Sequence, residues 1–194
     1  MSVLGKNAIK KLLAETEIEK RLFITPILEE TQITESSIDV RLGNDFIATK
    51  KGSVTCVDPS EDYNLSIFQT THRVNLREKF ILHPKELVLA STLEYVRLPL
   101  SVSGYVTSRS SWGRSGLVIA TATIIHPGFK GVITLELINL GEVPIVLYPG
   151  LAVAQLVLHD CKDAEPYKGQ FAKATTTMGS KISTKKDINK FWLS

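Results

Sequence analysis

Hydrophobic and polar residues alternate in short runs over most of the chain between residues 36 and 158. A period of two predicts strands, because successive side chains of a strand point to opposite faces. The stretch 36–46 is the strictest case and predicts a half-buried strand, with Ile38 on its apolar face and with Asp39 and Arg41 on its polar face. Asp39 and Arg41 are neighbours there, and the simplest interpretation of both is that they pair with each other.

Short apolar stretches bounded by turn residues predict strands at residues 80–82, 86–98, 143–147 and 151–158. The turns between them are marked by a His-Pro step at residue 83 and by a Tyr-Pro-Gly step at residue 148. Residues 50–79 are mostly polar and predict a long excursion with one short strand.

One amphipathic helix is predicted before the strands, at residues 7–22. Asn7 is a suitable N-cap, the apolar positions begin at Ile9, and Pro26 prevents continuation. A single helix followed by many short strands predicts a mainly β fold, either a sandwich or a barrel.

The stretch 104–139 has three apolar runs separated by two polar, glycine-containing breaks, which predicts three strands joined by turns. The first break, residues 108–116, concentrates serine, arginine and glycine beyond what a turn needs. Guanidinium groups, hydroxyls and free backbone N–H groups are the groups that bind a polyphosphate. The break is therefore a candidate phosphate-binding turn.

Glu136 is the unusual residue of the third run. Alternation places it on one face with Val132, Thr134 and Ile138. A carboxylate among apolar neighbours is costly unless it is paired or used. Two interpretations stay open: the face is solvated or Glu136 pairs with an arginine, or Glu136 is a functional acid.

The composition of the 194 residues is 43% hydrophobic and 22% charged, with a net charge of +3. These values predict one globular domain over residues 1–194 and do not indicate nucleic-acid binding. The two cysteines, Cys56 and Cys161, are far apart, which indicates a reducing compartment. No apolar run is long enough for a membrane span or a signal peptide, so we expect a cytoplasmic protein without membrane partners.

Residues 162–194 differ in character, with seven lysines among glycine, threonine and serine. This composition predicts a mobile C-terminal tail. A cationic tail beside a phosphate-binding turn could close over a ligand at the active site. The simpler interpretation is a solvated terminus.

Five motifs stand out along the chain: S-S-I-D-V-R-L-G-N-D-F (36–46), S-R-S-S-W-G-R-S-G-L (108–117), H-P-G-F-K-G-V-I-T-L-E-L-I-N (126–139), Y-P-G-L-A-V-A-Q-L (148–156) and Y-K-G-Q (167–170). Together they resemble the dCTP deaminase family of the dUTPase-like superfamily. Several long motifs in this order are specific. The resemblance extends from the N-terminal helix to about residue 182.

The resemblance implies a distorted β-barrel or jelly-roll protomer of dUTPase-like type and a homotrimer with three active sites at subunit interfaces. It implies metal-independent hydrolytic deamination of dCTP to dUTP and ammonia, with Mg²⁺ carried on the substrate triphosphate. A zinc deaminase would need H-x-E and P-C-x-x-C signatures, which this sequence lacks, so we expect no zinc. Whether dTTP acts as an inhibitor stays open.

The resemblance also implies site residues. Glu136 would be the catalytic acid/base, and Ser110 and Arg114 would position the water and that glutamate. One carboxylate that exchanges protons can serve the attack of water on C4, the protonation of N3 and the departure of ammonia. The residues that would contact substrate are Arg109, Ser111, Ala122, Ile125, His126, Tyr167 and Gln170.

Two departures from the family pattern affect these expectations. The family usually has I-D-P-G where this chain has I-H-P-G, and in dUTPases that aspartate activates the water that attacks the phosphate. His126 therefore favours dUTP as the end product over a dUTP pyrophosphatase or a bifunctional, dUMP-forming deaminase. A contact of His126 with the deoxyribose 3′-OH and a plain turn role are equally compatible with the sequence.

The second departure is a shortened tail, which leaves open which lysine reaches the phosphates. A non-catalytic nucleotide-binding trimer is the remaining alternative. The retained Glu136, Ser110 and Arg114 disfavour it, because a binding protein has no use for a buried acid.

Overall fold

The computed structural model describes residues 2–49, 68–120, 124–167 and 175–179. Its helices are α1 (Lys6–Leu13), η1 (Glu30–Gln32) and α2 (Ser110–Arg114). Its strands are β1 (Phe23–Thr25), β2 (Ile38–Thr49), β3 (Gln69–Arg73), β4 (Phe80–Leu82), β5 (Leu87–Arg97), β6 (Val102–Ser108), β7 (Leu117–Ile119), β8 (Ile124–Ile125), β9 (Lys130–Asn139), β10 (Ile145–Leu147) and β11 (Ala152–Asp160). The prediction of a mainly β fold with one N-terminal helix is confirmed.

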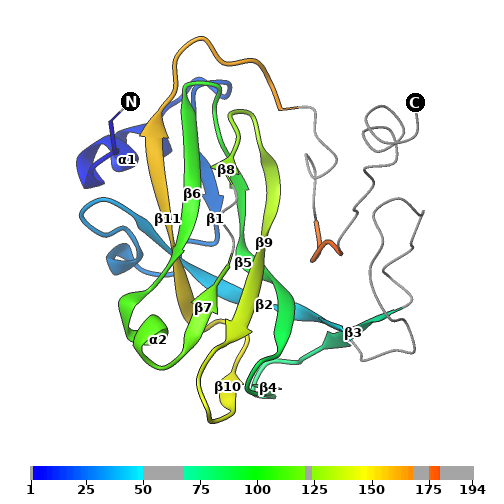
Figure 1. The fold of residues 1–194 in the computed structure, drawn as a ribbon. Helices are drawn as coiled ribbons and strands as arrows, with labels where there is room; N and C mark the ends of the chain where they lie inside the picture. The colour runs from blue at the N-terminus through cyan, green and yellow to red at the C-terminus, as the bar shows by residue number, and fades with distance from the viewer. Residues whose placement is uncertain (1, 50–67, 121–123, 168–174, 180–194) are drawn as a thin grey trace, which may run out of the picture.

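The strands form one large curled sheet and a small separate pair (Figure 1). The large sheet has the order β7-β9-β5-β2-β11-β6-β8, with β1 added on β5 and β3 added on β2, while β10 pairs with β4. The strand pairs are antiparallel. Among the described residues this order does not close on itself, so the sheet is a curled half-barrel.

The hydrophobic core is built from the buried faces of the long central strands. Val40 of β2, Ala90 of β5, Leu135 of β9 and Leu156 of β11 are fully buried and belong to one cluster. The branched and aliphatic side chains at alternate positions of these strands explain why they pair at this length. The strands expected at residues 80–98 and 143–158 are confirmed as β4, β5, β10 and β11.

The helix α1 is shorter than the predicted helix at residues 7–22. It begins after Gly5, which makes no side-chain cap, so Asn7 lies inside the first turn instead of capping it. It ends at Leu13, and the carboxylate of Glu15 then accepts hydrogen bonds from the N–H groups of Thr16 and Glu17 at 2.8 and 3.2 Å. These bonds stabilise a turn that competes with the helix.

The predicted polar face of β2 is buried too. Because β2 lies between β5 and β11, both of its edges are paired, and Asp39 and Arg41 are only 9% and 8% exposed. The interpretation that they pair with each other is wrong, since each has a different partner. Nη2 of Arg41 lies 2.6 Å from Oε1 of Glu29, and Oδ2 of Asp39 lies 3.5 Å from Nη2 of Arg109.

Candidate active site

The candidate phosphate-binding turn at residues 108–116 contains the short helix α2, which connects β6 to β7 (Figure 1). Two contacts attach its beginning to the first residues of β11. The N–H of Arg109 donates to the carbonyl of Val153 at 3.1 Å, and Nε1 of Trp112 donates to the carbonyl of Ala152 at 2.9 Å. Ser110, Ser111 and Arg114 are exposed on this helix. The attachment leaves hydroxyl and guanidinium groups at the surface, where a ligand can reach them.

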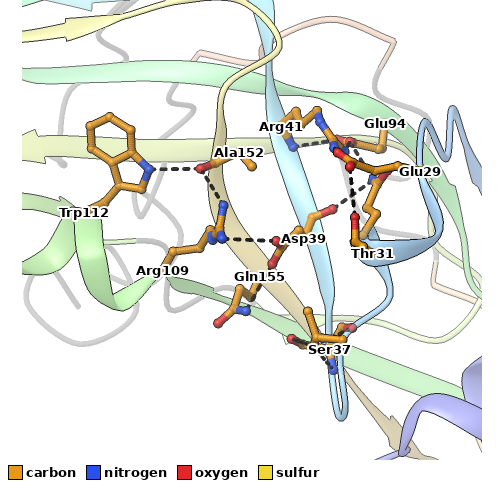
Figure 2. A network of polar contacts seen from close by, with 12 residues as sticks. Glu29, Thr31, Ser37, Asp39, Arg41, Glu94, Arg109, Trp112, Ala152 and Gln155 are labelled. Atoms are coloured by element: carbon orange, nitrogen blue, oxygen red, sulfur yellow. Dashed lines mark hydrogen bonds and ion pairs between the residues drawn. The ribbon is translucent and has the colours of Figure 1, made fainter.

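Arg109 is the link between α2 and the buried strand β2 (Figure 2). Its Nη2 lies 3.5 Å from Oδ2 of Asp39, and its Nη1 lies 3.4 Å from the carbonyl of Ala152. The other carboxylate oxygen of Asp39 accepts a hydrogen bond from Nε2 of Gln155 at 3.1 Å. Gln155 thus orients the carboxylate of Asp39, which in turn orients the guanidinium group of Arg109. The side chain of Arg109 is 39% exposed.

The connection from α2 to β7 makes a close backbone approach. Gly116 has a φ of 93°, and its carbonyl accepts a hydrogen bond from the N–H of Leu140 at 2.8 Å. A Cβ atom at Gly116 would lie 2.7 Å from the backbone nitrogen of Gly141. Only glycine satisfies both the backbone conformation and this separation. The end of α2 is therefore locked to the turn that follows β9.

Glu136, the predicted acid/base, lies in the middle of β9 opposite Leu89 of β5. The predicted alternation is confirmed: Leu135 and Leu137 are fully buried, whereas Glu136 is half-buried. Its backbone carbonyl accepts a hydrogen bond from the N–H of Ala120 at 2.8 Å, directly after β7. The segment that begins with α2 thus reaches β9 at the residue that carries the carboxylate.

Residues 175–179 of the C-terminal segment pack on the face of β9 that carries Glu136. The N–H of Met178 donates to the hydroxyl of Thr134 at 3.2 Å, and the hydroxyl of Thr177 donates to the carbonyl of Asp45 at 2.9 Å. Thr134 and Glu136 are two residues apart in a strand, so their side chains share a face. Residues 175–179 therefore lie on the Glu136 side of the sheet.

Ile125 and His126 belong to the turn between β8 and β9. Ile125 is buried and faces Gly104 of β6 in register, while His126 is exposed. The rings of His126 and Tyr167 are stacked, with centroids 4.8 Å apart and planes at 18°. The structure thus brings together two predicted substrate-binding residues that are far apart in the sequence. Ala122 and Gln170, which the sequence also singles out, lie outside the described residues, as do six of the seven tail lysines.

A buried ion cluster was missed by the sequence analysis. Glu94 is completely buried, and its carboxylate accepts a hydrogen bond from Nε2 of Gln32 at 2.9 Å. It also accepts one from the N–H of Arg41 at 2.8 Å (Figure 2). Burial raises the pKa of Glu94, and the hydrogen bond and positive charge from Arg41 oppose that rise. The sequence does indicate that Glu94 is buried, because Glu94 alternates in phase with the buried residues Val88 and Val96.

The described residues contain no cluster of potential metal ligands. Across residues 2–49, 68–120, 124–167 and 175–179, no three histidine, cysteine or acidic side chains are placed to hold a metal ion. No helix among them is long and apolar enough to cross a membrane.

Comparison with known proteins identifies the family. A family model described as "dCTP deaminase-like" matches residues 3–161, so the chain belongs to the dCTP deaminase-like family. A relative named "dCTP deaminase, dUMP-forming" from Methanobrevibacter smithii is 40% identical over 158 residues, which are 81% of this chain and 79% of that protein. Another, named "dCTP deaminase" from Halorubrum lacusprofundi, is 41% identical over 146 residues, which are 74% of this chain and 72% of that protein.

A solved structure has the same fold. The crystal structure of 2′-deoxycytidine 5′-triphosphate deaminase from Agrobacterium tumefaciens superposes with a TM-score of 0.62 at 20% identity. The match covers 82% of this chain and 48% of that chain, so this protein spans about half the length of the other. At this identity the similarity concerns the fold alone.

Proposed function

We propose that this protein is a hydrolytic deaminase that converts the cytosine of dCTP to uracil and releases ammonia. The observation that carries the proposal is Glu136, a half-buried carboxylate on a central strand of a chain that belongs to the dCTP deaminase-like family. Its relatives from M. smithii and H. lacusprofundi are both named as dCTP deaminases.

In the proposed reaction a water molecule adds to C4 of the cytosine, and Glu136 takes up one of its protons and passes it to N3. The remaining proton of the new C4 hydroxyl is then moved by Glu136 to the amino group, so that ammonia leaves as the C4 carbonyl forms. Ser110 and Arg114 position the water and the carboxylate. One positioned acid/base of this kind contributes about 10²–10⁴-fold to the rate.

The phosphate groups of the substrate would bind at α2. Arg109 and Ser111 are the proposed phosphate ligands, because a half-exposed guanidinium that is already oriented by Asp39 can form paired hydrogen bonds with a phosphate. Mg²⁺ is proposed to arrive with the triphosphate, since it commonly binds through substrate phosphates and retained waters. Ala122, Ile125, His126, Tyr167 and Gln170 are the remaining proposed contacts with the nucleotide.

The proposed site needs more than one copy of the chain. Ser110 and Arg114 are exposed on α2, whereas catalysis requires groups that are held in place and shielded from bulk water. A homotrimer with sites at its interfaces would cover these residues, and it would place a net charge of about +9 around a polyanionic substrate.

A second candidate differs in the product. The name of the M. smithii relative favours a dUMP-forming enzyme, in which the dUTP is also hydrolysed at the α-phosphate. The expectation that the reaction stops at dUTP rests on His126 alone, at the position where the family pattern has an aspartate. Neutral histidine can also act as a base, so the names of the relatives favour the second candidate over that expectation.

The deciding experiment is to incubate the purified protein with dCTP and Mg²⁺ and to quantify ammonia, dUTP, dUMP and pyrophosphate. Ammonia with an equal amount of dUTP would support the simple deaminase. Ammonia with equal amounts of dUMP and pyrophosphate would support the dUMP-forming enzyme. Binding of dCTP without release of ammonia would refute both and leave a nucleotide-binding protein.

Metal dependence is tested in the same assay. A zinc-selective chelator is expected to leave the rate of ammonia release unchanged, whereas removal of Mg²⁺ is expected to lower it. Loss of activity with the zinc chelator, restored by added zinc, would contradict a metal-independent mechanism.

A further inference from the structure

The turn that carries His126 is flanked by buried residues and closed by a backbone hydrogen bond. Ile125 before it is buried and paired with β6, and Phe129 after it is 8% exposed. The N–H of Phe129 donates to the carbonyl of His126 at 3.1 Å, and Gly128 has a φ of 76°, which closes the turn. The imidazole is exposed, but the backbone that holds it is fixed on both sides.

The residues that follow β11 meet this turn (Figure 1). The N–H of Tyr167 donates to the carbonyl of Pro127 at 3.2 Å. A Cβ atom at Gly128 would lie 3.5 Å from both Cα of Pro166 and the nitrogen of Tyr167, so the two backbones are in contact. The backbone contact and the stacked rings of His126 and Tyr167 therefore join the same two segments, the turn between β8 and β9 and the residues after β11.

We infer that His126 is a positioning residue whose ring is a stacking platform for Tyr167, and that it fixes the start of the C-terminal segment on the turn between β8 and β9. The stacked geometry has the centroid separation at which aromatic pairs attract. Such a pair changes a docking equilibrium by about two- to tenfold. The backbone hydrogen bond alone leaves the ring of Tyr167 free to rotate away.

The inference gives a role to the residue that departs from the family pattern. An aspartate at position 126 has no ring face, so it could not hold Tyr167 in this way. The role needs only an aromatic ring, which distinguishes it from acid/base chemistry and from a hydrogen bond to a sugar hydroxyl. It concerns the substrate-free protein and does not depend on the proposed reaction.

The direct test is the proton spectrum of the full-length, substrate-free protein. Protons that lie over an aromatic ring are shielded, so Tyr167→Leu is expected to move the ring signals of His126 downfield, with assignment by their loss in His126→Asn. The pair Tyr105 and His159, with centroids 5.3 Å apart, provides a matched control. Tyr105→Leu should move the signals of His159 and not those of His126. Unchanged His126 signals in Tyr167→Leu would overturn the inference.

Limited trypsin digestion supplies a second measurement, since cleavage of a segment that opens rapidly follows the population of its open form. Cleavage after Lys168, the next residue in the sequence, is expected to be about two- to tenfold faster in His126→Asn than in wild type, matching the loss of one aromatic pair. His126→Phe keeps a ring without its nitrogens and should restore the slow rate. Equal rates for wild type and His126→Asn, or equally fast cleavage of His126→Phe and His126→Asn, would overturn the inference.

Discussion

An ion pair joins the carboxylate of Asp39 to the guanidinium group of Arg109. The carboxylate lies 3.5 Å from the guanidinium group, and Gln155 fixes the other carboxylate oxygen at 3.1 Å. The strand β2 and the helix α2 are thereby joined by one ion pair at the place where the proposed phosphate ligands begin. An arginine that is oriented before the substrate arrives loses less conformational freedom when it binds.

Asp39→Asn is expected to raise the KM for dCTP while it changes the free energy of unfolding by less than about 1 kcal/mol, because the guanidinium group of Arg109 is 39% exposed and stays solvated without the buried carboxylate. The variant removes the charge that orients Arg109 and keeps an oxygen for Gln155. Steady-state kinetics and urea unfolding check the two parts. Asp160→Asn is the matched control, since Asp160 is an exposed carboxylate bonded to Ser2. A KM equal to that of wild type would show that Arg109 needs no orientation.

Glu136→Gln is expected to lower kcat for ammonia release by about 10²–10⁴-fold and to leave dCTP binding nearly unchanged, because glutamine keeps the shape of the side chain but cannot carry a proton. Single-turnover rates and equilibrium binding measure the two effects separately. Glu142→Gln, an exposed substitution in the turn after β9, is the control. Turnover by Glu136→Gln near the wild-type rate would mean that another group is the base.

Glu94 makes stability depend on pH in a definite direction. Its pKa is raised above 4.5, so between 4.5 and the raised value the folded protein binds more protons than the unfolded chain, and stability falls as the pH rises. Glu94→Gln has no such proton to lose. The free energy of unfolding of wild type minus that of the variant is therefore expected to be largest below pH 4.5 and to decrease as the pH rises through this window.

Urea unfolding across this pH range measures that difference. Glu19→Gln, at an exposed position, is the comparison variant. A difference that grows with pH would show that the attraction of Arg41 outweighs burial.

The trimer is expected to appear in sedimentation at micromolar concentration, and mixed subunits test whether its sites are shared. If Glu136 and Arg114 act across an interface, co-expression of Glu136→Gln with Arg114→Ala should give mixed trimers in which about one quarter of the sites are intact, as expected for random assembly. Each variant alone should be inactive. A monomer in solution, or no recovery in the mixture, would contradict a shared site.

Alternation along the strands was the reliable guide to this fold. The buried Leu135 and Leu137 and the half-buried Glu136 follow directly from the period of two in β9. The extent of α1 could not be obtained in the same way, because the turn after Leu13 depends on the competing hydrogen bonds of a single side chain, Glu15.

Contacts between elements that are far apart in the sequence could not be predicted from its pattern. Strand spacing predicts that Asp39 pairs with Arg41, but the order of the sheet buries β2 between two neighbours and brings α2 to it from more than 60 residues away. The stack of His126 on Tyr167 is of the same kind. Periodicity reports which face a side chain occupies, and only the assembled sheet decides what lies on that face.

The backbone approach of Gly116 to Gly141 limits how this chain can vary. A side chain at Gly116 would collide with the main chain of the turn after β9, so no change of rotamer could relieve it. The turn at residues 140–144 and the end of α2 are therefore expected to change together or not at all. A library that varies the serines and arginines of α2 can leave this turn untouched, whereas one that includes Gly116 should recover only glycine there unless residues 140–142 are varied with it.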